Sequence, residues 1–281
     1  MIKHILVALD GSKHGQVALE QSVVLAQQLG ARLHGVHVLD SSMLRSSLLH
    51  DFSGSVGLEP QLHLRSQLEG FMKTVAESLL QNFKLRCEAA GVVGHAEVVT
   101  ATVVEGLLEA AHRADLVVLG RHGSAYDLSP NDHGHGSTVR QLIRSSPTSL
   151  FVTGTEVRAL QKILVGMDGS PGSWKALKSA VILARELKVG LEVAQVTPIG
   201  SLERPEILTQ AQTYADGYGV AAHYHARRGD PVVVLLELLQ QTGADLLAVG
   251  YEGGSRLREF FIGHTPDALM TRVSQRLWVA H

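Results

Sequence analysis

Two glycine-rich loops contain the residue types that could bind a phosphate group. In each half of the chain an apolar run ends in glycine, a second glycine follows three residues later, and a third precedes a helical pattern. These residues are Gly120, Gly123 and Gly136-Ser137-Thr138 in the first half, and Gly250, Gly253 and Gly263-His264-Thr265 in the second. Glycine lets the backbone approach phosphate oxygens, and a helix start offers N–H groups at its positive end. The arrangement predicts one phosphate site per half, although a tight turn and a helix cap at Ser137 would need similar residues.

A second repeated feature precedes these loops. Residues 5–12 read Ile-Leu-Val-Ala-Leu-Asp-Gly-Ser, and residues 163–170 read Ile-Leu-Val-Gly-Met-Asp-Gly-Ser. Each apolar run is typical of a buried strand, and it ends at Asp10 or Asp168. In open α/β sheets, ligands bind beyond the carboxyl ends of the strands. Because Asp10 and Gly120 both follow strands, we expect the topology to bring them together.

Several well-known motifs are absent from the sequence. No Gly-Lys-Ser/Thr occurs, which excludes a Walker P-loop, and no Gly-x-Gly-x-x-Gly follows the first strand. No Gly-x-Ser-x-Gly elbow marks a hydrolase nucleophile. Among the 15 histidines, His133 and His135 beside Asp132 could bind a divalent ion. Pro130 and Gly134 favour a polar loop there instead, so we expect no metal site.

Composition limits the classes of protein that this chain could be. It has 281 residues, enough for two domains, with 45% hydrophobic and 19% charged residues, as in globular proteins. The net charge of −2 argues against nucleic acid and anionic membranes as partners. The single cysteine, Cys87, allows no intrachain disulfide and suits the cytoplasm. We see neither a signal peptide nor an apolar run long enough to cross a membrane.

Strand and helix patterns alternate along both halves. Strands are expected at 3–9, 32–39, 95–100 and 149–153, at 190–196, 221–226 and 276–280, and in the runs that end at Asp168, Gly120 and Gly250. Helices are expected at 14–29, 65–90, 104–113, 138–145, 231–242 and 265–273, and in a pattern that includes Leu177 and Leu187. Gly30 and Gly190 would stop the first helix of each half, and residues 41–62 resemble a loop.

This alternation predicts two doubly wound α/β domains, each with a five-stranded parallel sheet. We expect the domains at 1–154 and 162–281, joined by a linker at 154–161. The stretch between Asp10 and Gly120 is 28 residues longer than the stretch between Asp168 and Gly250. The extra residues fall mainly within 41–90.

Both halves resemble universal stress protein domains, so the whole chain resembles a tandem member of that family, with its adenine nucleotide alpha hydrolase-like fold. The family's first strand ends in an aspartate before Gly-Ser, as at Asp10 and Asp168. Its ATP-binding members carry Gly-x2-Gly-x9-Gly followed by Ser or Thr. The second half has that glycine spacing but places His264 after the third glycine, whereas the first half has Gly136-Ser137 after a longer gap.

The resemblance implies an ATP site, with or without Mg²⁺, in each half. Asp10 would lie near adenine or ribose, because a carboxylate can accept from ribose hydroxyls or the adenine amine. The alternative is an aspartate that only closes a turn. His122 could contact phosphate when charged. The implied site residues are Ala8, Leu9, Asp10, Val38, Leu119, Gly120, His122, Gly123, Gly136, Ser137 and Thr138, and in the second half Asp168, Val196, Gly250, Gly253, Gly263 and Thr265.

The function that follows is an ATP-binding regulator or sensor in the stress response. The alternatives are a slow ATPase or nucleotidyl-transfer enzyme, and a scaffold whose second half binds no nucleotide. Family members commonly dimerise through their last strand, so the resemblance also implies pairing between the two halves. We expect the apolar strands at 149–153 and 276–280 to run antiparallel side by side. A homodimer of the whole chain remains open.

Overall fold

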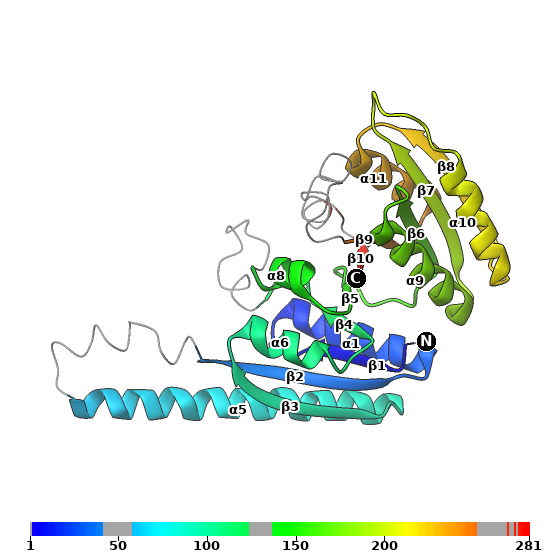
Figure 1. The fold of residues 1–281 in the computed structure, drawn as a ribbon. Coiled ribbons are helices and arrows are strands. Elements are labelled where there is room, and N and C mark those ends of the chain that lie inside the picture. The colour runs from blue at the N-terminus through cyan, green and yellow to red at the C-terminus, as the bar shows by residue number, and fades with distance from the viewer. Residues whose placement is uncertain (1, 42–57, 124–136, 252–268, 270–272, 274) are drawn as a thin grey trace.

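In the computed structural model, the strands among the described residues join one ten-stranded sheet with helices on both faces (Figure 1). The structure describes residues 2–41, 58–123, 137–251, 269, 273 and 275–281. The first half contains β1 (His4–Ala8), α1 (Lys13–Leu29), β2 (Arg32–Asp40), α5 (Leu58–Ala90), β3 (Gly94–Ala101), α6 (Val103–Ala111), β4 (Leu116–Leu119), α8 (Ser137–Ser145) and β5 (Ser149–Val152). The second contains β6 (Lys162–Met167), α9 (Pro171–Leu187), β7 (Gly190–Thr197), α10 (Glu206–Gly217), β8 (Ala222–Arg228), α11 (Pro231–Thr242), β9 (Leu246–Gly250) and β10 (Arg276–Ala280).

The strand order confirms the predicted fold class and the pairing of the two halves. It reads β3-β2-β1-β4-β5-β10-β9-β6-β7-β8, so the second half repeats the first in reverse order across the centre. Within each half every neighbouring pair is parallel, whereas β5 and β10 are antiparallel, with Phe151 opposite Trp278. This reversal gives the chain a pseudo-two-fold axis between β5 and β10, and it leaves neither last strand as a bare edge.

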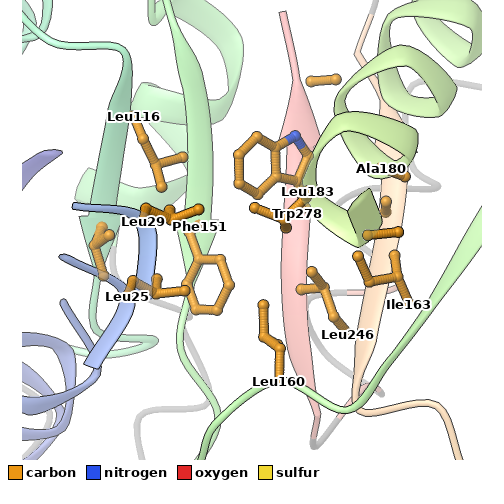
Figure 2. Close-up of a cluster of buried hydrophobic side chains, with 14 of the residues drawn as sticks. Leu25, Leu29, Leu116, Phe151, Leu160, Ile163, Ala180, Leu183, Leu246 and Trp278 are labelled. Carbon is orange, nitrogen blue, oxygen red and sulfur yellow. The ribbon is translucent and has the colours of Figure 1, made fainter. Parts of the chain in front are cut away.

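The hydrophobic core runs without a break across this junction. Phe151 and Trp278 are both buried, and their rings meet edge to face with centroids 6.4 Å apart. Leu25 of α1 lies on one side of the pair and Leu183 of α9 on the other, as Figure 2 shows. Leu160 of the connecting segment is buried in the same cluster. The two halves therefore share one apolar layer.

Two local predictions need correction. Helix α5 begins at Leu58, so residues 58–62 are helical rather than loop-like. Gly190 does not stop α9, because Lys188 caps that helix in a left-handed conformation and Gly190 begins β7. In contrast, Gly30 ends α1 as expected. The predicted helix at 265–273 lies almost wholly outside the described residues.

The repeated Asp-Leu pair before β4 and β9 has a structural role. Asp115 Oδ2 accepts hydrogen bonds from the N–H groups of Lys3 and His4, over 2.7 and 2.9 Å. Asp245 Oδ1 accepts in the same way from Lys162 N–H at 3.2 Å, just where β6 begins. Each carboxylate therefore ties the start of the first strand of its half to the neighbouring strand. This pairing fixes the sheet register at the end opposite the predicted ligand site.

Candidate functional site

The Asp-Gly-Ser turn after β1 caps a helix and orients a carboxylate. The N–H and Oγ–H groups of Ser12 donate to Asp10 Oδ1 over 3.0 and 2.8 Å. Ser12 also caps α1, because its Oγ accepts from Gly15 N–H at 2.8 Å. Gly11 has φ +76°, a left-handed conformation that glycine adopts at little cost. The turn thus leads the chain from strand to helix while holding Asp10 by one oxygen.

The other oxygen of Asp10 faces the first glycine loop. A Cβ added to Gly123 would lie 3.3 Å from Asp10 Oδ2, so these residues are neighbours. Within the described ranges, both hydrogen bonds of the Asp10 carboxylate go to Oδ1. The structure therefore brings together Asp10 and Gly123, which lies three residues after the Gly120 that the topology is expected to place near Asp10.

Gly120 and Gly250 are required by packing. A Cβ at Gly120 would lie 2.7 Å from the carbonyl carbon and oxygen of His14, in the first turn of α1. A Cβ at Gly250 would lie 2.0 Å from the carbonyl carbon of Gly172, in the first turn of α9. Backbone atoms of a helix cannot move aside as a flexible side chain can. Close strand–helix approach alone accounts for both glycines, and a nucleotide contact by either stays a prediction.

The remaining predicted residues of the first half differ in how they could meet a ligand. Leu9 and Leu119 are buried in the core, so only their backbone atoms could face a ligand. Ala8 and Val38 are partly buried on the sheet face that packs against α6 and α8. Helix α8 begins at Ser137, which places Thr138 in its first turn. Gly136 lies outside the described residues.

His122 and Arg121 extend the site from the end of β4. The His122 ring lies edge-on to His14, with centroids 4.9 Å apart, at the start of α1. Arg121 is buried and donates to the carbonyl oxygens of Val273 and Gln275, the latter at 2.7 Å. Burial lowers the pKa of the Arg121 guanidinium. Arg121 therefore links the strand that leads into the first glycine loop to the other half of the chain.

The corresponding turn in the second half is more crowded. The N–H and Oγ–H groups of Ser170 donate to Asp168 Oδ1 over 2.9 and 2.6 Å, as in the first half. A Cβ added at Gly169 would lie 2.8 Å from Ile207 Cδ1. A Cβ added at Gly11, the matching glycine of the first half, would lie 3.4 Å from its nearest neighbour, Leu79 Cδ2. The start of α10 thus approaches this turn more closely than α5 approaches its counterpart.

The other predicted residues of the second half are less accessible or lie outside the described residues. Val196, the counterpart of Val38, is only 5% exposed and faces the core. Gly253, Gly263 and Thr265 all fall outside the described residues. The repeat of the aspartate turn is therefore observed, but the phosphate-binding part of the second site stays a prediction.

A small cavity lies between the start of α10 and the ends of β7 and β8. Its volume is about 180 Å³, and two of its lining residues are Arg204 and Arg228. Arg228 Nε pairs with Glu203 at 2.7 Å, and Arg204 Nε pairs with Glu206 at 3.2 Å. Ligand pockets are usually about 300–1,000 Å³. The cavity is therefore smaller than most ligand pockets, and both of these arginines already have carboxylate partners.

The fold and site define a class of protein: two doubly wound α/β repeats that pair within one chain, each with an aspartate after its first strand and a glycine at the end of its fourth. Comparison with known families is in agreement. The family described as "Universal stress protein family" matches residues 1–154 and 159–281, which together cover almost the whole chain. The chain belongs to the universal stress protein family.

Individual relatives span the full chain as well. It is 25% identical to "Universal stress protein Slr1230" of Synechocystis sp., covering 97% of this chain and 98% of that protein. A universal stress protein structure from Archaeoglobus fulgidus superposes with a TM-score of 0.75 at 17% identity, covering 99% of this chain and 97% of the other. A second, from Pseudomonas aeruginosa and called putative in its description, has a TM-score of 0.63 at 16% identity, covering 99% and 93%. These two structures share the tandem fold.

In the part of the chain that the structure describes, no helix combines the length and the apolar composition of a membrane span.

Proposed function

We propose that the first half of this chain binds ATP at the carboxyl ends of β1, β2 and β4, and that the bound nucleotide regulates the protein's conformation or partners in a stress response. The observation that carries the proposal is the oriented carboxylate of Asp10. Its Oδ1 is held by Ser12, and its Oδ2 faces Gly123. A carboxylate oxygen in this position can accept from ribose hydroxyls or the adenine amine.

The surroundings of Asp10 fit the rest of a nucleotide. Val38 is partly buried on a neighbouring strand and offers an apolar contact for adenine. Helix α8 begins at Ser137, and the N–H groups of a helix start favour phosphate. His122 lies beside the start of α1 and would add positive charge when protonated. These residues support a site that binds the base and the phosphates together.

Three features support weaker binding in the second half. The turn at Gly169 is crowded by Ile207, and Val196 is buried where Val38 is partly accessible. His264 also replaces the hydroxyl residue that follows the third glycine in the first half. A hydrogen bond to a charged group contributes about 1.5–3 kcal/mol, so the loss of one would weaken ATP binding about tenfold or more.

Calorimetric titration with ATP, with and without Mg²⁺, tests the proposal through a matched pair of variants. Asp10→Asn keeps an oxygen to accept from Ser12 but replaces the oxygen that faces Gly123. Asp168→Asn makes the same change in the other half. We expect D10N to weaken ATP binding about tenfold or more, because a charged hydrogen bond is lost, and D168N to leave the main binding event in place. Unchanged affinity in D10N would refute the proposal.

Phosphate release measured in the same samples separates regulator from enzyme. A hydrolase needs a base and a metal site beside the γ-phosphate. The acidic candidates near the glycine loops, Asp127, Asp132 and Glu252, lie outside the described residues. Slow or absent turnover with intact ATP binding supports the regulator, whereas rapid turnover would support an ATPase.

A further inference from the structure

Three potential metal ligands meet at the outer edge of the first half, far from the Asp10 turn. His34 lies on β2 directly opposite His95 on the edge strand β3, and Glu97 follows two residues later on the same face. Their ligand atoms all lie within 4.8 Å of one another. We call these three residues the edge cluster. They lie in the amino-terminal halves of β2 and β3, whereas Asp10 follows the carboxyl end of β1.

The contacts within the edge cluster are close and directional. His34 Nε2 lies 3.0 Å from Glu97 Oε1, and the His34 and His95 rings are stacked with centroids 5.8 Å apart. His34 and Glu97 are partly buried, whereas His95 is exposed. Two members are therefore held by the sheet, and the third can rotate. Among the described residues, no other three His, Cys, Asp or Glu side chains bring their ligand atoms this close together.

We propose that the edge cluster is a binding site for a divalent transition-metal ion of the zinc type, with His34, His95 and Glu97 as its three protein ligands. Two imidazoles and one carboxylate form a ligand set that zinc and its neighbours use, with water in the remaining positions. Ligand atoms about 2.1 Å from a common ion lie at most about 4.2 Å apart, so the cluster must contract slightly. Rotation of the exposed His95 side chain supplies that movement.

Arg113 is the residue that competes with a metal at this site. Its guanidinium, just after α6, lies 2.9 Å from Glu97 Oε1, the same oxygen that His34 contacts. Among the described residues, the hydrogen bonds and ion pairs of Glu97 all use Oε1, so Oε2 could bind an ion while Arg113 keeps its partner. Arg113 would nevertheless repel a nearby cation. Its removal should therefore strengthen metal binding, which a purely structural salt bridge would not do.

The second half contains a related group of side chains that provides an internal control. Glu192 on β7 lies opposite His223 on β8, and His225 follows on the same face. Here the carboxylate lies between the histidines, with Oε1 3.4 Å from His223 Nδ1 and Oε2 2.8 Å from His225 Nε2. Lys162 Nζ adds a positive charge 3.5 Å from Oε1. Both carboxylate oxygens are occupied, so this group should not bind a metal tightly.

The test is calorimetric titration of Zn²⁺ into the full-length, untagged protein after chelator treatment. Replacing His133 and His135 by alanine in every sample removes the histidine pair that the sequence analysis considered as metal ligands. We expect one site per chain, weakened at least about tenfold by His95→Ala and by Glu97→Gln, since each loses a ligand. Arg113→Met should bind about fivefold more tightly because a competing charge is removed. His223→Ala, the matched control, should bind as the parent does.

Circular dichroism of each variant verifies that it is folded, and Co²⁺ gives a second measurement. We expect a visible ligand-field spectrum from Co²⁺ that His95→Ala abolishes and His223→Ala preserves. Absence of a saturable Zn²⁺ site in the parent would overturn the proposal. So would binding that is unchanged in both His95→Ala and Glu97→Gln. Neither outcome bears on ATP, because the edge cluster and the Asp10 turn share no residue.

Discussion

Alanine at Phe151 and at Trp278 should reveal how strongly the two halves stabilise each other. The N–H of Thr153 donates to Leu119 O on β4, so the N–H of Phe151 faces β4 as well. Phe151 and Trp278 therefore form a non-hydrogen-bonded pair, in which opposite side chains come closest. Each substitution removes a buried aromatic ring and should cost about 3–5 kcal/mol. Together they should cost less than the sum by about 0.5–1.5 kcal/mol, the usual coupling of an edge-to-face pair.

Equilibrium unfolding in urea measures these free energies with two probes. Both tryptophans, Trp174 and Trp278, belong to the second half, so fluorescence reports on that half while circular dichroism reports on both. We expect Phe151→Ala, in the first half, to shift the tryptophan transition to lower urea. Coincident transitions in the parent protein would show that the halves unfold together.

A control pair distinguishes contact from general destabilisation. Phe83 is buried on α5 and packs against β2 and β3, with β1, β4 and β5 between it and β10. Phe83→Ala and Trp278→Ala should be additive to within about 0.5 kcal/mol, as distant sites usually are. The reasoning is refuted if Phe151→Ala and Trp278→Ala are equally additive, or if Phe151→Ala leaves the tryptophan transition unmoved.

Three further predictions follow from local geometry. Gly120→Ala should lower the free energy of unfolding by about 1–3 kcal/mol, because the added Cβ would meet the backbone of His14. Gly70→Ala, the control in α5 where the added Cβ meets open space, should raise it by about 0.5–1 kcal/mol. A Gly120→Ala protein that unfolds at the same temperature as the parent would contradict this. Burial lowers the pKa of His281 from 6.5 to about 4. As the pH falls, the imidazole is therefore protonated in the unfolded chain before it is protonated in the folded protein. The free energy of unfolding should decrease as the pH drops from about 6.5 to 4. His281→Gln should remove this contribution to the pH dependence of stability, which is at most about 3 kcal/mol before solvent screening. If the urea midpoint depends on pH in the same way in His281→Gln and in the parent, this role of His281 is excluded. Burial, with a smaller contribution from Glu88, raises the pKa of the Cys87 thiol to about 11. A disulfide reagent at about pH 8 should therefore label Cys87 only after the protein is unfolded in urea. Rapid labelling of the native protein would contradict the burial of this thiol.

The architecture was predictable because its strands are short apolar runs that end at turn residues. The predicted strand at 276–280 matches β10, and the predicted strand at 149–153 is one residue longer than β5. The residues that the sequence left uncertain are polar and amphipathic. The sequence sets no clear bounds for helix α10, because Glu206–Gly217 buries only Ile207, Ala211 and Ala215. Such a narrow apolar stripe is hard to distinguish from a polar connection.

The site was predictable only in part, because one residue can serve packing and binding alike. The repeat of Gly120 and Gly250 suggested phosphate contact, yet both positions lie against a helix start where no Cβ fits. The edge cluster could not be found from the sequence at all. It depends on the register that sets His34 opposite His95, and register follows from the paired strands rather than from either strand alone. The role of Arg121 could not be predicted from the sequence either, because the carbonyl oxygens that accept its hydrogen bonds belong to the other half of the chain.

A crystal structure of the chain grown with ATP would test the central claim most directly. The account predicts adenosine within hydrogen-bond distance of Asp10 Oδ2 and phosphates beside the start of α8. Electron density for the nucleotide at Asp168 alone, in the cavity beside α10, or nowhere under saturating ATP would contradict it.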